Sequence, residues 1–148
     1  MLSLTRKADY ALIAAVYLAR QAACGAGPVS AREIGSQFDL PVPVLMNVLK
    51  QLASAGLLRS TRGIGGGYEL ALSPSAVSLV DVVQAVAEGD AEVAEADAEA
   101  GAGGGALRAL RDRLDGFFRR MTLAELLQQT AGNEREAIVR LRGMDESR

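Results

Sequence analysis

Basic side chains beside a run of glycines are the residues of this sequence best suited to chemistry. Lys50, Arg59 and Arg62 precede the glycines of segment 63–67. Ammonium and guanidinium groups bind phosphate, and glycine lets a backbone approach a partner closely. The glycines lead into a predicted strand, whereas the phosphate loop of a nucleotide site opens a helix. The pattern therefore indicates phosphate contacts from a hairpin rather than a nucleotide-binding loop.

Side chains for common catalytic and metal sites are scarce. The 148 residues include no histidine and one cysteine, Cys24. Histidine is the commonest general base and metal ligand, and a single thiol forms neither an intrachain disulfide nor a cysteine-rich metal site. No nucleophile is paired with a base. We expect no enzyme activity, no metal site and an incidental role for Cys24.

Two short helices and a hairpin are predicted to position the basic residues. Ser30 and Glu33 have the spacing of a capping box, which starts a helix that ends near Phe38. Segment 39–41 (Asp-Leu-Pro) breaks this helix, and a second one is predicted over 43–55.

The second helix has an apolar stripe at helical spacing. Its members are Val44, Leu45, Val48, Leu49 and Leu52. Gly56 is suited to end it in the left-handed conformation. The residues that follow predict a strand over 57–61, a turn over 62–67 and a return strand over 68–72.

Helix, break, helix and basic hairpin in this order predict a winged helix-turn-helix. Its second helix fits the major groove of DNA, and the wing reaches phosphates or the minor groove. A plain helical domain whose glycines only make a tight turn is the alternative. We favour DNA binding because the elements occur together and in order.

An amphipathic helix is predicted over 1–23, entered at Ser3 or Thr5 and supporting the helix-turn-helix from behind. Thr5, Arg6 and Lys7 at its start either meet a phosphate or form a solvated helix end. The sequence alone does not favour one of these alternatives.

Charge is distributed unevenly between the two halves of the chain. Residues 1–72 hold seven Lys and Arg against four Asp and Glu, whereas residues 73–148 hold nine against fourteen. The half that carries the predicted wing is therefore the basic one, as phosphate binding requires. The absence of a long apolar run or a secretory pattern predicts a cytoplasmic protein with no membrane partner.

The C-terminal half is expected to supply a dimerisation helix. Segment 76–105 begins with a helix capped by Ser78 and Asp81 and continues as a flexible acidic loop rich in Ala and Gly. Segment 106–148 begins with a long helix whose apolar stripe suits a second copy of the chain, with an intramolecular core helix as the alternative. The predicted dimer-interface residues are Leu107, Leu110, Leu114, Phe117 and Met121. Thr122 and Glu125 cap a short helix that follows, and Asn133 and Glu136 begin a last one.

These elements define the fold class as mainly α with a small β-hairpin. The organisation predicted is a winged helix-turn-helix over 1–75, the connecting helix and loop over 76–105, and the dimerisation and C-terminal helices over 106–148. The many alanines make a thin core, which also favours a second subunit.

Four stretches, LTRKADYAL, VPVLMNVLKQLASAGLL, RGIGGGYELA and RMTLAELL, resemble the IscR/NsrR-type (Rrf-two) winged-helix transcription regulators of bacteria. The resemblance runs from residue 2 to about residue 128. It implies a homodimer on double-stranded DNA with a palindromic operator, most simply a repressor. The DNA contacts that it implies are Thr5, Arg6, Lys7, Tyr10, Pro43, Val44, Met46, Asn47, Lys50, Arg59, Arg62, Gly63, Gly65 and Gly66. Met46 stands where a relative reads bases with a carboxylate, so the operator preference should differ.

The chain differs from its cluster-binding relatives in the residues that would hold the iron–sulfur cofactor. Cluster-binding relatives carry three cysteines in the loop that corresponds to residues 89–106, where this chain has mainly alanine and glycine. Asp9 matches a carboxylate ligand of some nitric-oxide-sensing members, but a cluster needs about four ligands, mostly thiolates. We therefore predict no iron–sulfur cluster. Either this is a natural cluster-free member that senses a small molecule or a protein, or alanines have replaced cysteines.

A winged-helix module that acts mainly through a protein partner is the competing function. The acidic C-terminal half suggests it.

Overall fold

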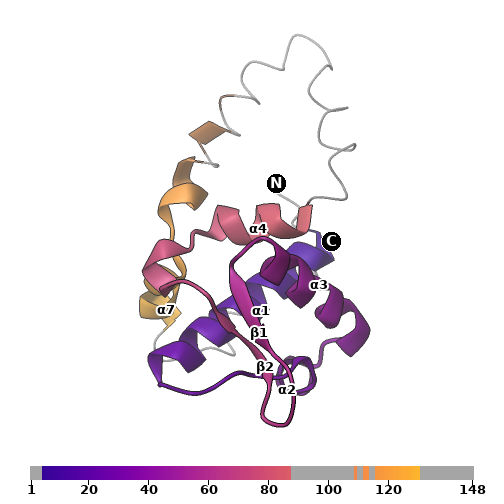
Figure 1. Ribbon diagram of the computed structural model, residues 1–148. Helices are drawn as coiled ribbons and strands as arrows, with labels where there is room; N and C mark the ends of the chain where they lie inside the picture. The colour runs from indigo at the N-terminus through magenta and orange to yellow at the C-terminus, as the bar shows by residue number, and fades with distance from the viewer. Residues whose placement is uncertain (1–4, 88–108, 110–111, 114–115, 131–148) are drawn as a thin grey trace.

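The elements follow the predicted order closely. A computed structural model describes residues 5–87, 109, 112–113 and 116–130. Helices α1 (Arg6–Ala23), α2 (Ala31–Phe38) and α3 (Val42–Ser54) come first, and strands β1 (Leu58–Thr61) and β2 (Gly67–Leu70) follow. A 3-10 turn, η1 (Pro74–Ala76), leads to α4 (Leu79–Ala87), and α7 is Leu123–Thr130 (Figure 1). The fold is mainly helical with one small antiparallel hairpin.

Local capping sets the first two helix starts. The Thr5 hydroxyl accepts a hydrogen bond from the Ala8 amide at 3.3 Å, so α1 begins at Arg6 and the predicted entry at Thr5 is confirmed. The Ser30 hydroxyl accepts one from the Glu33 amide at 3.1 Å. Each bond satisfies one amide that a helix start leaves without a partner in the helix.

The break between α2 and α3 lies at the predicted residues. Asp39 ends α2 in the left-handed conformation with φ 55°. Helix α3 then begins after Pro41, with Pro43 in its first turn, where a missing N–H costs no hydrogen bond. Gly56 follows the helix with φ 80°, as predicted.

The buried stripe of α3 corrects one expectation. Leu45, Val48, Leu49 and Leu52 are fully buried, but Val44 is 39% exposed and is not part of the core. The four buried positions already form the inward face at spacings of three and four residues, and Val44 falls at its edge.

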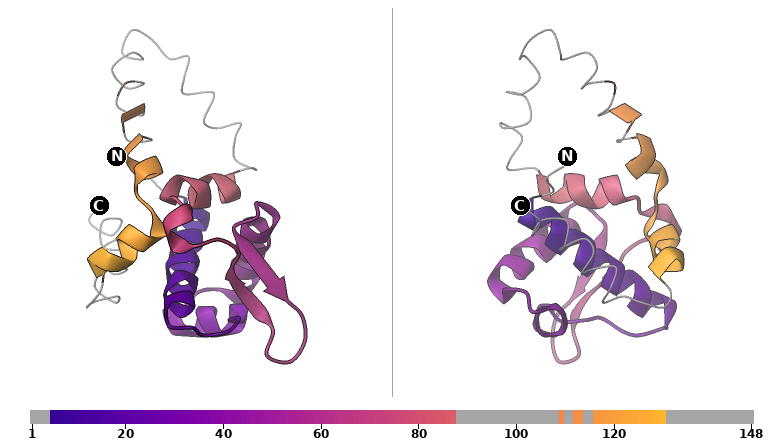
Figure 2. Two further views of the ribbon diagram at one scale, coloured as in Figure 1. Left: turned by 60° about the vertical axis from the view of Figure 1, so that its left-hand side comes forward. Right: turned by 180° about the vertical axis from the view of Figure 1, so that it is seen from behind.

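Alanine-rich α1 lies at the centre of the core and contacts α3, α4, α7 and β2 (Figures 1 and 2). Small side chains let neighbouring helices approach closely. The core of the described part includes Ala11, Ala14 and Leu18 of α1. It also includes Val82 and Val86 of α4. Helix α7 contributes the fully buried Leu123.

The hairpin is tied to the chain ahead of α2. Leu58 pairs with Leu70 and Thr61 with Gly67 in an antiparallel register. Val29 pairs with Tyr68 on the other side of β2, through backbone hydrogen bonds of 2.9 and 2.7 Å. The hairpin base is therefore fixed on both sides of β2, while its tip projects beyond the helices (Figure 2).

A second isolated bridge joins the starts of α4 and α7. Ser78 pairs with Thr122, and both residues are helix caps. The Ser78 amide donates to Asp81 at 2.9 Å, and the Asp81 amide donates to the Ser78 hydroxyl at 3.1 Å. Thr122 and Glu125 exchange the same pair of bonds at 3.0 and 3.3 Å. These two predicted capping boxes are confirmed.

Much of the predicted dimerisation segment lies outside the described residues. This holds for Leu107, Leu110 and Leu114, for the acidic loop over 89–105, and for the helix predicted from Asn133. The described residues 116–120 are helical, and Phe117 is 50% exposed. Met121 is half-buried and packs against the core of its own chain. The boundaries of the three predicted segments stay a prediction, as does the long helix.

No helix in the described part of the chain combines the length and apolarity that crossing a bilayer requires.

Candidate nucleic-acid interface

The outer face of α3 carries the predicted groove-reading residues. Pro43, Val44, Met46, Asn47 and Lys50 are all exposed. At about 100° per residue, Pro43, Asn47 and Lys50 lie opposite the buried leucine and valine stripe, and Val44 and Met46 lie at the edges of the outer face. The sequence predicted the side of the helix that faces outward.

The charge of this face suits an anionic partner. Lys50 is the only charged residue of α3, which contains no Asp or Glu. Asn47 adds an amide that both donates and accepts hydrogen bonds, which suits an adenine edge in the major groove. A helix without carboxylates approaches DNA phosphates with no like-charge repulsion of its own.

The hairpin tip presents Arg62 on a glycine turn. The Arg62 side chain is exposed, and the Gly66 amide donates a 3.0 Å hydrogen bond to the Gly63 carbonyl. Gly63 and Gly65 have φ of 102° and 77°. A Cβ at position 66 would lie 2.2 Å from the Thr61 oxygen, so only glycine fits there. The turn therefore holds Arg62 at the projecting end of the wing.

Arg59 is paired inside the hairpin. Its Nε lies 3.8 Å from Oε1 of Glu69, its partner in the antiparallel register. Both side chains are partly exposed, at 64% and 37%, so the pair contributes little to stability. Glu69 was not expected at the site, because its pairing with Arg59 depends on a strand register that the hairpin sequence leaves open. A carboxylate beside Arg59 competes with any phosphate that Arg59 would bind.

The predicted DNA contacts at the start of α1 are only partly accessible to a partner. Thr5 and Arg6 are exposed, whereas Lys7 and Tyr10 are half-buried. Tyr10 packs against the hydrophobic core. The Thr5 hydroxyl already accepts the capping bond from Ala8, and its proton remains available to a phosphate oxygen.

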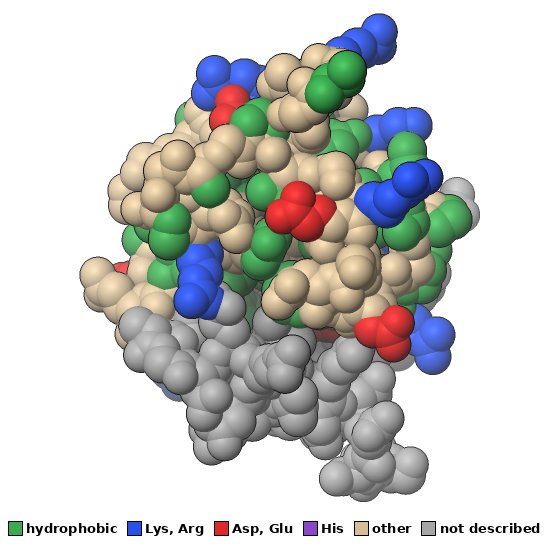
Figure 3. All heavy atoms as spheres, turned by 90° about the horizontal axis from the view of Figure 1, so that it is seen from below, with side chains coloured by type: hydrophobic (Ala, Val, Ile, Leu, Met, Phe, Trp, Pro, Cys, Tyr) green, Lys and Arg blue, Asp and Glu red, His purple; other side chains and the backbone are tan. Residues whose placement is uncertain are grey.

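Basic side chains project at several places around the end of the molecule that carries the hairpin tip (Figure 3). Hydrophobic side chains lie between them, and acidic ones are few. Ile64 at the tip is fully exposed, which the sequence alone did not indicate. Such a surface can bind phosphates and make apolar contacts in the same groove.

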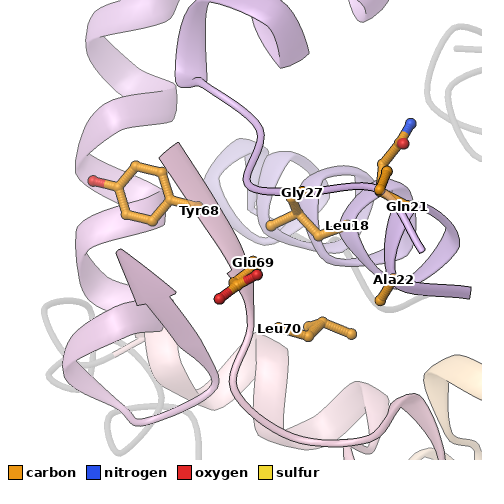
Figure 4. Close-up of a pocket in the computed structure, with 8 residues that line it drawn as sticks. Leu18, Gln21, Ala22, Gly27, Tyr68, Glu69 and Leu70 are labelled. Carbon is orange, nitrogen blue, oxygen red and sulfur yellow. The ribbon is translucent and has the colours of Figure 1, made fainter. Parts of the chain in front are cut away.

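A small cavity of about 80 Å³ lies between the end of α1, the loop after it and β2. Leu18, Gln21, Tyr68 and Leu70 are among its lining residues (Figure 4). Pockets for small molecules typically measure about 300–1,000 Å³. This cavity is therefore too small for a drug-sized effector.

Among the described residues, no three His, Cys, Asp or Glu side chains lie close enough together to hold a metal ion. Cys24 is exposed in the loop after α1. The cysteine-free loop over 89–106 lies entirely outside the described residues.

An exposed helix without carboxylates and a basic glycine-tipped wing define the winged helix-turn-helix class of DNA-binding proteins. The family described as "Rrf2: Iron-dependent Transcriptional regulator" matches residues 4–129. The chain belongs to this family. It is a DNA-binding transcriptional regulator and not an enzyme.

Curated relatives carry the description "HTH-type transcriptional regulator IscR". The one from Escherichia coli (strain K12 / DH10B) is 34% identical over 131 residues, which cover 84% of this chain and 79% of the relative. The one from Cereibacter sphaeroides is 34% identical over 87 residues, or 59% of this chain and 56% of the relative.

Solved structures show the same fold. The T. potens IscR structure superimposes with a TM-score of 0.72 and 25% identity, over 87% of this chain and 88% of that one. The Staphylococcus aureus CymR structure gives a TM-score of 0.68 and 26% identity, over 82% and 95% of the two chains. The fold class and the family predicted from the sequence are confirmed.

Proposed function

We propose that this regulator works as a homodimeric repressor that binds a palindromic operator. The observation that carries the proposal is the pairing of α3's outer face with the arginine-tipped wing. Two copies of such a unit read two half-sites about one helical turn apart. Phe117, an exposed aromatic side chain ahead of α7, is consistent with a surface that a second copy covers.

Substitution of Arg62 tests the DNA interface. An operator is first selected from a pool of random duplexes, and affinity is then measured by mobility-shift titration. Arg62→Gln should weaken operator binding by at least tenfold, since the wing loses a charge-assisted contact. Arg120→Gln removes an exposed arginine outside the winged helix and serves as the matched control. Equal affinities of the two variants would refute the wing's role.

Repression is tested separately in a reporter strain. With the selected operator placed over a promoter, expression of this chain should lower reporter output. The Arg62→Gln variant should restore it. An increase in output with the native chain would identify an activator.

We also propose that the chain works without an iron–sulfur cluster. A single chain offers one thiolate, Cys24, exposed on a loop and with no histidine anywhere in the sequence. A cluster requires about four ligands, mostly thiolates, so this donor set does not fit one. Protein purified without oxygen should lack the visible absorbance of a cluster, and added chelator should leave operator affinity unchanged.

A regulator that acts mainly through a protein partner or a small-molecule effector is the second candidate. It is favoured by the acidic C-terminal half, residues 73–148, which contains fourteen acidic and nine basic residues. Pull-down from lysate with and without nuclease separates the two candidates. Partners that survive nuclease treatment would support this function, and partners that disappear would support DNA binding.

A further inference from the structure

Two apolar side chains are exposed on the surface that the proposed function assigns to DNA. Val44 is 39% exposed and Met46 is 42% exposed, both on α3. Elsewhere in the described residues, Leu72 and Phe117 are comparably exposed, and Ile64 at the wing tip is fully exposed. Burying Val44 and Met46 against a partner would be favourable, because exposed apolar area is costly in water.

The two side chains flank the polar centre of the helix face. At about 100° per residue, Asn47 and Lys50 lie near the middle of the face opposite the buried stripe. Val44 and Met46 lie at its two edges, about 160° apart around the axis. An α3 helix inserted into a groove would therefore place its polar groups at the floor and one apolar group toward each side.

Major-groove chemistry specifies what such a face recognises. The C5-methyl of thymine is the apolar group on the base edges of that groove. An amide such as that of Asn47 matches the N6 and N7 atoms of adenine, the base that pairs with thymine. A carboxylate that would accept from the cytosine amino group is absent from α3.

We propose that Val44 and Met46 read the C5-methyl groups of thymines on either side of the base pairs that face Asn47. This inference rests on the proposed binding of α3 in the major groove. It makes thymine methyls a determinant of operator choice, and it predicts an operator half-site rich in A·T pairs where α3 inserts.

Replacing thymine by deoxyuridine removes only the methyl group, so it tests the proposal at single positions. Each thymine of the selected operator is replaced in turn, and affinity is measured for the native chain. Two positions per half-site should each weaken binding by about fourfold, the equivalent of about 0.8 kcal/mol for one methyl-sized apolar group. The remaining replacements should leave affinity unchanged.

Variants then assign each methyl to its reader. Met46→Ala should abolish the deoxyuridine penalty at one position and Val44→Ala at the other. Met46→Leu keeps an apolar group of similar size and should retain the penalty. Leu72→Ala removes a side chain of similar exposure, 46%, that follows the end of β2 and is not on α3, and should behave as the native chain. Thermal melting of each variant confirms that the fold is intact.

The outcomes separate this inference from the proposed function. Duplex binding that is indifferent to every deoxyuridine would overturn methyl reading while leaving the DNA-binding function standing. A penalty that persists unchanged in both Met46→Ala and Val44→Ala would also overturn it. A chain that binds no duplex, even at low salt, would instead overturn the proposed function.

Discussion

At position 66 a side chain of any size would meet the hairpin's own backbone. A Cβ there would approach the Thr61 oxygen to 2.2 Å and the Gly63 oxygen to 2.9 Å. We expect Gly66→Ala to lower the free energy of unfolding by about 1–3 kcal/mol, because an overpacked site must distort its surroundings. Gly27→Ala is the control, since its Cβ would meet nothing within 4 Å. Urea unfolding measures both, and equal stabilities would mean that the wing turn adapts freely.

Gln51 of α3 destabilises the fold in a different way, through a buried polar atom. Its Oε1 atom is buried and has no hydrogen-bond partner in the structure. Gln51→Met keeps the length of the side chain and removes the unsatisfied oxygen, so it should raise the free energy of unfolding by about 1 kcal/mol. Gln37→Met, at an exposed position of α2, should leave it nearly unchanged. A loss of stability at position 51 would show that the amide finds a partner in solution.

The cross-strand pair of Arg59 and Glu69 in the wing limits how well Arg59 can bind a DNA phosphate. Glu69→Gln removes the carboxylate 3.8 Å from Arg59 and should strengthen DNA binding about two- to fivefold, the range expected for an exposed pair. Combining it with Arg59→Ala should reduce this gain, because the released arginine is then absent. If Glu69→Gln strengthened DNA binding equally with Arg59 and with Ala at position 59, the gain would come only from the change in net charge.

At the scale of elements, local signals were predictable and long-range pairings were not. The caps at Ser30, Ser78 and Thr122 depend on residues three positions apart, so the sequence predicted them correctly. The bridges that join Val29 to Tyr68 and Ser78 to Thr122 span about 40 residues each and carry no local signature. Val44 was counted in the apolar stripe but is 39% exposed, because helical spacing alone does not define where a buried stripe ends.

The same distinction applies to the candidate interface. Basic residues, glycines and the outward side of α3 follow from residue type and periodicity. The pairing of Arg59 with Glu69 follows from the strand register, which a hairpin sequence leaves open. The exposure of Ile64 follows from how far the wing projects, which depends on the contacts at the hairpin base.

The twin capping boxes lead to a prediction for α4 and α7. Ser78→Ala and Thr122→Ala each remove a hydroxyl that accepts a helix-start amide, and each should lower the free energy of unfolding by about 1 kcal/mol. Ser36→Ala, exposed within α2, should change it by less than about 0.5 kcal/mol. Chemical denaturation followed by circular dichroism measures all three. Cap variants as stable as the control would mean that the backbone bridge alone holds the two helix starts together.

At the scale of the whole molecule, the two halves of the chain carry net charges of opposite sign. Residues 1–72 carry the net positive charge that DNA attracts, and residues 73–148 carry the net negative charge. With an overall charge of −2, non-specific attraction to DNA should be modest. Binding must then rely on the few cations of α3, the wing and the start of α1, which makes each one measurable by its effect on salt dependence.

Salt dependence can also count the copies of the chain on DNA. The slope of log affinity against log salt changes by about 0.9 for each phosphate charge that is neutralised. If two copies bind one operator, Arg62→Gln removes two contacts and should lower the slope by about 1.8. The Arg120→Gln control should retain the native slope. A decrease of about 0.9 would indicate a single bound copy, and no decrease would place Arg62 away from DNA. This measurement therefore tests the proposed homodimer, in which two identical wings would contact one operator.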